Sequence, residues 1–205
     1  MPGKFEFFFD FSSPYSYLAS TQVEAVAKRA GATLIWRPFL LGGVFKTTGN
    51  IPPVHNAYKA RYLLKDLQNW CEHYGLPPLK FPEEFPINSL KAIRLAIAVD
   101  RAGHLAPFVH AVYRRVFEEG RDISDVEILR GTLRGLALDP EPLLAQVELP
   151  EIKDALRRNT DEAVGRGSFG APTFFVNDED MYIGNDRLMF VEKALTTTGG
   201  SPWQR

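Results

Sequence analysis

The chain has one cysteine and almost no excess charge. Cys71 is the single cysteine of 205 residues, so no intrachain disulfide can form and a reducing compartment is expected. Lysine and arginine number 24 against 25 acidic residues, which gives a formal net charge of -1. This balance provides no electrostatic attraction for nucleic acid or for an anionic membrane. The four histidines show no metal-ligand spacing, so no metal site is expected.

Long hydrophobic runs are also absent. The first apolar run, residues 5–9, is far too short to cross a bilayer. Residues 1–4 lack the basic start, the apolar core and the small-residue cleavage site of a signal peptide. We therefore expect a cytoplasmic protein with no membrane partner.

Hydrophobic patterning predicts strands near both ends of the chain and helices between them. Short apolar runs bounded by turn residues predict strands at residues 4–9, 33–37, 173–177 and 181–183. Helical periodicity and end signals predict helices at residues 18–30, 60–74, 89–101, 106–118, 125–136, 141–146, 150–165 and 187–195. The first two strands, joined by a helix, predict a parallel βαβ unit. We therefore expect an α/β domain, residues 1–45 and 166–205, interrupted by an inserted all-helical domain, residues 46–165.

One segment between the first predicted strand and the first predicted helix carries most of the chemical information. Residues 9–17 spell Phe-Asp-Phe-Ser-Ser-Pro-Tyr-Ser-Tyr. Free N–H groups and the dipole at such a helix start favour an anion. In thioredoxin-like proteins Cys-x-x-Cys occupies this place, and here it is replaced by Ser13-Pro14-Tyr15-Ser16. Since both sulfurs are missing, we expect the site to hold a thiolate brought by another molecule. The alternative is a simple N-cap at Ser13, a role that Ser12 could share.

Two motifs near the C-terminus complete the candidate site. The run Phe169-Gly170-Ala171-Pro172-Thr173-Phe174 opens the third predicted strand. A cis Ala171–Pro172 bond there would present the N–H and C=O of Ala171 to an extended peptide-like ligand. The run Gly184-Asn185-Asp186-Arg187 precedes the last predicted helix, whose start could grip the charged end of a small peptide. A plain turn before the strand, and an N-cap at Asn185 or Asp186, are the alternatives.

Taken in chain order, these motifs together with Thr47, Gly49 and Asn50 resemble the 2-hydroxychromene-2-carboxylate isomerase family. That family belongs with the kappa class glutathione transferases and the DsbA-like proteins. The resemblance runs over nearly the whole chain. It implies a DsbA-like fold, in which the helical insertion interrupts a thioredoxin-like domain, and a homodimer. It also implies glutathione as a cofactor and a small aromatic carboxylate as the substrate, isomerised by thiolate addition, rotation and elimination.

The resemblance also implies roles for individual residues. Ser13 matches a serine beside the glutathione sulfur, and no histidine lies near it in the sequence to act as a base. We therefore interpret Ser13 as a hydrogen-bond donor that stabilises a bound thiolate. Ala57 stands where some members carry arginine. The implied glutathione contacts are Ala171, Pro172, Gly184, Asn185 and Asp186, and the implied substrate contacts are Lys46, in the loop after the second strand, Asn56 and Phe85.

Other functions are compatible with the same motifs. A kappa-type glutathione transferase, which conjugates electrophiles or reduces peroxides, would share the thiolate site and differ in its substrate pocket. A non-catalytic peptide-binding module on a thioredoxin frame is permitted by the missing cysteines. A dithiol oxidoreductase is disfavoured, because Ser13 and Ser16 replace both sulfurs.

Overall fold

A mixed four-stranded sheet forms the centre of the structure, a computed structural model that describes residues 3–197. The strand order is β2-β1-β3-β4, with β1 (Lys4–Phe9) parallel to β2 (Thr33–Pro38). On the other side of β1, β3 (Thr173–Val176) and β4 (Asp180–Ile183) form an antiparallel hairpin. All four strands were predicted from the sequence, and the parallel first pair is confirmed. Residues 1–2 and 198–205, which belong to the predicted α/β domain, lie outside the described part of the chain.

The segment predicted as one helix over residues 18–30 is two helices, α1 (Pro14–Ser20) and α2 (Val23–Ala30). The helix begins earlier than predicted because Pro14 occupies its first turn, a position that needs no N–H donor. It ends at Ser20, and the hydroxyls of residues 20 and 21 bond to carbonyls of its last turn. The Ser20 hydroxyl donates to the Tyr17 carbonyl, and the Thr21 hydroxyl donates to the Leu18 carbonyl, both at 2.7 Å.

The remaining helices follow the predicted pattern, with two additions. Helix α3 (Leu41–Thr48) and a short 3₁₀ turn (Pro53–His55) were not predicted, and the segment predicted at 106–118 changes from α to π geometry after Tyr113. The others are α4 (Ala57–Tyr74), α5 (Leu90–Arg101), α6 (Leu105–Tyr113), the π turn Arg114–Glu118, α7 (Val126–Gly135), α8 (Pro140–Gln146), α9 (Pro150–Gly165), the 3₁₀ turn Asn185–Arg187 and α10 (Leu188–Thr196). Between residues 3 and 197, none of the helices is long and apolar enough to span a membrane.

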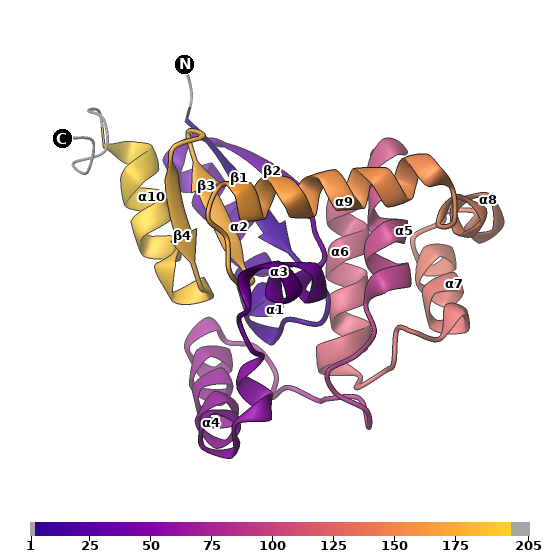
Figure 1. The fold of residues 1–205 in the computed structure, drawn as a ribbon, viewed down its shortest axis with the longest axis horizontal. Helices are drawn as coiled ribbons and strands as arrows, with labels where there is room; N and C mark the ends of the chain where they lie inside the picture. The colour runs from indigo at the N-terminus through magenta and orange to yellow at the C-terminus, as the bar shows by residue number, and fades with distance from the viewer. Residues whose placement is uncertain (1–2, 198–205) are drawn as a thin grey trace.

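The helices surround the sheet unequally (Figure 1). Helix α10 packs on α2 beside the sheet, whereas α9 runs from the sheet to α8 above α5, α6 and α7. Helix α4 lies below the sheet and contacts α1, and α3 packs against α9. The chain returns from the helices to the sheet after α9, which brings residues 168–187 back beside the start of α1.

The core divides at the plane of β1. Phe5, Phe7 and Phe9 point to one side and join the larger cluster, whereas Phe8 points to the other side and packs with Phe39. All are fully buried, and each contributes about 1.5–3 kcal/mol relative to exposure. The larger cluster also contains the inner faces of α5, α6 and α9, so the helices and the sheet share one core. The predicted boundaries at residues 46 and 166 stay a prediction.

Candidate active site

Ser13 lies where β1 ends and α1 begins. Its N–H donates to the Asp10 carbonyl at 3.0 Å, which closes the turn. Its hydroxyl oxygen accepts from the Ser16 N–H at 3.1 Å and thereby caps α1. The same hydroxyl donates to the Ala171 carbonyl at 3.1 Å. The Ala171–Pro172 peptide bond is cis, as predicted. The two motifs that the sequence placed in one site are therefore in direct contact.

A cavity of about 480 Å³ opens beside Ser13. Its walls are α3, the loop before the 3₁₀ turn at Pro53, the loop around Phe85 and the loop before β3. Apolar side chains dominate the lining, and a few polar groups stand among them, as in most small-molecule sites. The lining includes Ser12, Ser13, Phe45, Asn50, Phe85 and Ala171.

A second cavity of about 350 Å³ adjoins the first, with Tyr15 and Gly184 lining both. Asp66 and Asp186 give this second cavity an acidic lining, which suits a positively charged group. The Tyr15 hydroxyl donates to the Asp66 carboxylate at 2.7 Å. Burial and the bond to Asp66 raise the pKa of Tyr15 well above its ordinary value, so the phenol stays a donor.

The segment from Gly184 to Asp186 forms the rim between the two cavities. Gly184 has a φ of 103°, and a Cβ at this position would collide with the Asp186 carboxylate. Asn185 is buried, and its amide donates to the Tyr74 hydroxyl at 3.5 Å. The expected N-cap role of Asn185 or Asp186 is wrong, because both belong to a 3₁₀ turn and neither side chain caps α10. The Asp186 carboxylate instead accepts from the Arg187 guanidinium at 2.6 Å.

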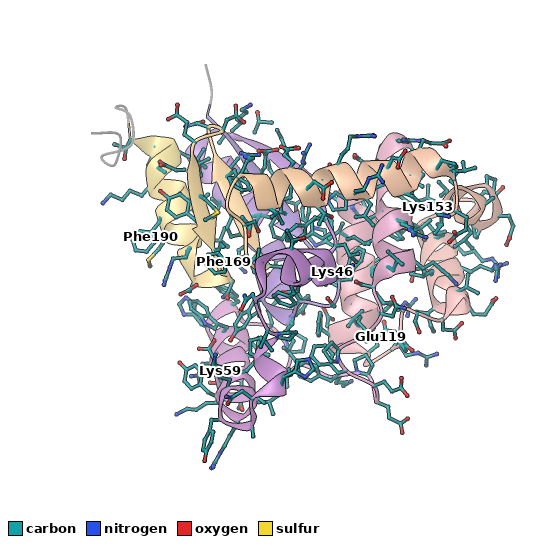
Figure 2. The ribbon with its side chains drawn as sticks, in the orientation of Figure 1. Lys46, Lys59, Glu119, Lys153, Phe169 and Phe190 are labelled. Carbon is teal, nitrogen blue, oxygen red and sulfur yellow. The ribbon has the colours of Figure 1, made fainter. Side chains whose placement is uncertain are left out.

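The residues implied as substrate contacts lie in different places in the structure. Phe85 lines the cavity beside Ser13. Lys46 is exposed on α3, not in a loop, and lines a different cavity of about 440 Å³ with Arg94 and Lys153 (Figure 2). Asn56 is exposed and caps α4, since its side-chain amide oxygen accepts from the N–H groups of Tyr58 and Lys59 at 3.1 and 3.2 Å. Of the three, Phe85 alone lines the cavity that Ser13 lines.

Asp10 was not predicted as a site residue. It is fully buried at the end of β1. One carboxylate oxygen accepts from the N–H and the hydroxyl of Ser12 at 2.8 and 2.9 Å. The other accepts from the N–H of Leu41, at the start of α3, at 2.7 Å. The spacing Asp-x-Ser is typical of a turn closed by the aspartate side chain and was the available signal.

Sequence comparison identifies the family. The family of DSBA-like thioredoxin domains matches residues 4–196. A 2-hydroxychromene-2-carboxylate isomerase of Sphingobium xenophagum is 35% identical over 193 residues, which covers 93% of this chain and 96% of the relative. The human glutathione S-transferase kappa 1 is 27% identical over 216 residues, which covers 99% and 93%.

Structural comparison agrees with the sequence. The solved structure of a 2-hydroxychromene-2-carboxylate isomerase superimposes with a TM-score of 0.85 at 29% identity, covering 94% of both chains. The shared architecture is the DsbA-like one seen here, a thioredoxin-type sheet with many helices between its strands. The chain therefore belongs to the 2-hydroxychromene-2-carboxylate isomerase family within the DSBA-like thioredoxin domains.

Proposed function

We propose that this protein is a glutathione-dependent isomerase that interconverts 2-hydroxychromene-2-carboxylate and trans-o-hydroxybenzylidenepyruvate in aromatic catabolism. The observation that carries the proposal is the Ser13 hydroxyl, which lines an apolar cavity and bonds to Ala171 where a thioredoxin would carry a reactive cysteine. Relatives at 35% and 32% identity carry the isomerase name. The relatives named glutathione S-transferase kappa support the use of glutathione.

The residues present fit glutathione. Ala171 lines the first cavity, its carbonyl accepts from the Ser13 hydroxyl, and none of the hydrogen bonds among residues 3–197 uses its N–H. Both groups can pair with the peptide backbone of the tripeptide. Asp186 and Asp66 in the second cavity suit the ammonium of its γ-glutamyl end. Gly184 and Asn185 form the rim beside them, so the ligand would span both cavities.

Ser13 is well placed to donate a hydrogen bond to a sulfur. Its oxygen accepts from the Ser16 N–H, which polarises the hydroxyl and strengthens it as a donor. Helix α1 has seven residues, so its dipole adds little and the hydroxyl is the main stabilising group. A bound thiolate within reach of Ser13 would accept the hydrogen bond that the hydroxyl now donates to the Ala171 carbonyl. This donation lowers the pKa of the bound thiol.

The chemistry that glutathione supplies when bound is reversible thiolate addition to the substrate's side-chain carbon, with rotation before elimination. The chain's own residues provide the surroundings. Phe45 and Phe85 offer aromatic surface for the substrate ring, and the apolar walls exclude water. The Asn50 amide lines the same cavity and donates to the Phe169 carbonyl at 2.9 Å. Lys46 and Asn56 stay proposed partners for the substrate carboxylate. Neither lines the cavity of Ser13, and Leu40 lies between that cavity and the one that Lys46 lines, because it lines both cavities.

A kappa-type glutathione transferase is the second candidate. The large apolar cavity would accept varied electrophiles. The alignment with human glutathione S-transferase kappa 1 covers 99% of this chain at 27% identity. The products separate the two functions, since an isomerase returns free glutathione and a transferase leaves a stable conjugate. A non-catalytic module is the third candidate, and it requires that neither product forms.

We also propose that the protein is a homodimer through α4. Three large hydrophobic side chains of this helix are exposed, those of Tyr58, Tyr62 and Leu64. A group of exposed hydrophobic side chains on one helix often marks a protein–protein contact. Sedimentation equilibrium measures the mass directly. A monomer at micromolar concentration would contradict the proposal.

Calorimetric titration with reduced glutathione tests the proposed function. We expect saturable binding together with the ultraviolet absorbance of a thiolate, and loss of that absorbance in Ser13→Ala. Ser20→Ala is the matched control, because Ser20 is also a buried serine of α1 but bonds within the helix. Absence of binding to the wild-type protein would overturn both glutathione-dependent candidates.

A further inference from the structure

Asp10 is a buried carboxylate beside the site, and its side chain accepts three hydrogen bonds. The side chain receives the N–H and hydroxyl of Ser12 and the N–H of Leu41. Its backbone carbonyl receives the N–H of Ser13 at 3.0 Å and the hydroxyl of Tyr113 at 3.1 Å. Asp10 thus connects the serine turn to the start of α3, the helix that forms one wall of the cavity.

Two adjacent serines line the cavity, and their hydroxyls are committed differently. A serine hydroxyl has one hydrogen to donate. Ser12 gives its hydrogen to the Asp10 carboxylate, a strong acceptor, at 2.9 Å. Ser13 gives its hydrogen to the neutral Ala171 carbonyl at 3.1 Å, a weaker bond that an anionic acceptor can displace. Ser12 can therefore only accept from a ligand, whereas Ser13 can donate to one.

We propose that Asp10 is a positioning residue that makes Ser13 the single hydroxyl donor to the bound thiol. It does so by holding the Ser12 hydroxyl away from the sulfur and by fixing the turn that aims Ser13. Because the bond to Leu41 also fixes the start of α3, the same carboxylate sets the distance between Ser13 and the facing wall. The inference rests on the proposed function, since it concerns the activation of glutathione.

The Asp10→Asn variant tests this role. An amide replaces one acceptor oxygen with an NH₂ group, which cannot accept from Ser12 or Leu41. The turn should loosen, so Ser13 should be aimed less well at the sulfur and donate a weaker hydrogen bond to it. The pKa of the bound thiol should therefore rise by about one unit, which is a roughly tenfold loss of thiolate below that pKa. The measurement is a pH titration of thiolate absorbance with saturating glutathione. Asp122→Asn is the matched control, because Asp122 receives the N–H and hydroxyl of Ser124 in the same way at an exposed turn.

The direction of the shift separates the possible roles of Asp10. A purely electrostatic role would lower the thiol pKa in Asp10→Asn, because a negative charge is removed. A merely structural role would lower the melting temperature and leave the thiol pKa unchanged. Either result would overturn the proposal. If wild-type protein binds no glutathione, the proposed function fails and the inference fails with it.

A second variant decides the matter if Asp10→Asn does not fold. Ser12→Ala removes the hydroxyl that Asp10 holds and keeps the carboxylate. We expect it to shift the thiol pKa by a small fraction of the shift in Ser13→Ala. Equal shifts in Ser12→Ala and Ser13→Ala would show that Ser12 donates to the thiol, which contradicts the assigned role of Asp10.

Discussion

The Ser13 hydroxyl and the Ala171 carbonyl lie 3.1 Å apart although 158 residues separate them in the chain. This bond joins the two halves of the site across the sheet. It also directs the Ser13 hydroxyl hydrogen at the backbone carbonyl of the residue that precedes the cis proline. The proposed function depends on redirecting that hydrogen to a sulfur.

Ser13→Ala should raise the pKa of the thiol of bound glutathione and lower isomerase turnover by roughly 10- to 100-fold, because the hydrogen bond to the charged thiolate is lost. Titration of thiolate absorbance and initial rates at several pH values measure the two effects. Ser20→Ala should change neither, since its hydroxyl donates to the Tyr17 carbonyl inside α1. A Ser13→Ala enzyme with wild-type turnover would remove Ser13 from the mechanism.

Gly184→Ala should weaken glutathione binding about tenfold, since a strained backbone costs about 1–3 kcal/mol and the new Cβ displaces Asp186. Calorimetry measures the affinity. Gly131→Ala is the control, because a Cβ there meets nothing within 4 Å inside α7. It should stabilise the protein by about 0.5–1 kcal/mol and leave binding unchanged. Unchanged affinity in Gly184→Ala would place the γ-glutamyl end elsewhere.

Phe85→Ala should raise KM for the aromatic substrate about tenfold and change the glutathione affinity much less, because Phe85 lines the first cavity and not the second, where the γ-glutamyl end would bind. Steady-state kinetics and calorimetry separate the two quantities. Phe190→Ala provides a comparison, since Phe190 is exposed on α10 away from the cavity (Figure 2). If glutathione affinity falls as much as substrate affinity, Phe85 does not act on the substrate alone.

Stability should decline at alkaline pH through Tyr17. Burial, followed by the neighbouring Glu118 carboxylate, raises the pKa of Tyr17 well above its ordinary value of 10.0. The unfolded chain therefore loses this proton at a lower pH than the native protein. The contribution is complete below about pH 10 and is lost as the pH rises toward the native pKa.

Denaturant unfolding from about pH 8 to pH 11 measures this decline. Tyr17→Phe should make the alkaline slope shallower, because the variant has one such proton fewer. An identical slope in wild type and Tyr17→Phe would contradict the assignment.

Predictions from the sequence succeeded where a motif has a fixed place in the fold that the chain resembles. The contact between Ser13 and Ala171 followed from two motifs with fixed places in a thioredoxin-like sheet. The break between α1 and α2 was missed, although the hydroxyls of Ser20 and Thr21 beside it bond to residues only three positions away. Their effect is small and depends on which of two backbone geometries the surrounding core favours.

Helix α3 could not be predicted for a different reason. Gly42 and Gly43 lower its helix propensity, so the local sequence argues against it. The helix start is fixed by the Asp10 carboxylate, 31 residues earlier in the chain, which bonds to the Leu41 N–H. Lys46 was consequently assigned to a loop, and its true position over a separate cavity depends on the packing of α3 against α9. Such long-range determinants leave no periodic pattern.

The rate of isomerisation of 2-hydroxychromene-2-carboxylate by thiol-free protein, measured before and after addition of reduced glutathione, tests the central claim most directly. The account predicts negligible turnover without glutathione, a saturable increase with it, and no consumption of the thiol. A rate that does not respond to glutathione, or a stable glutathione conjugate as the sole product, would contradict it.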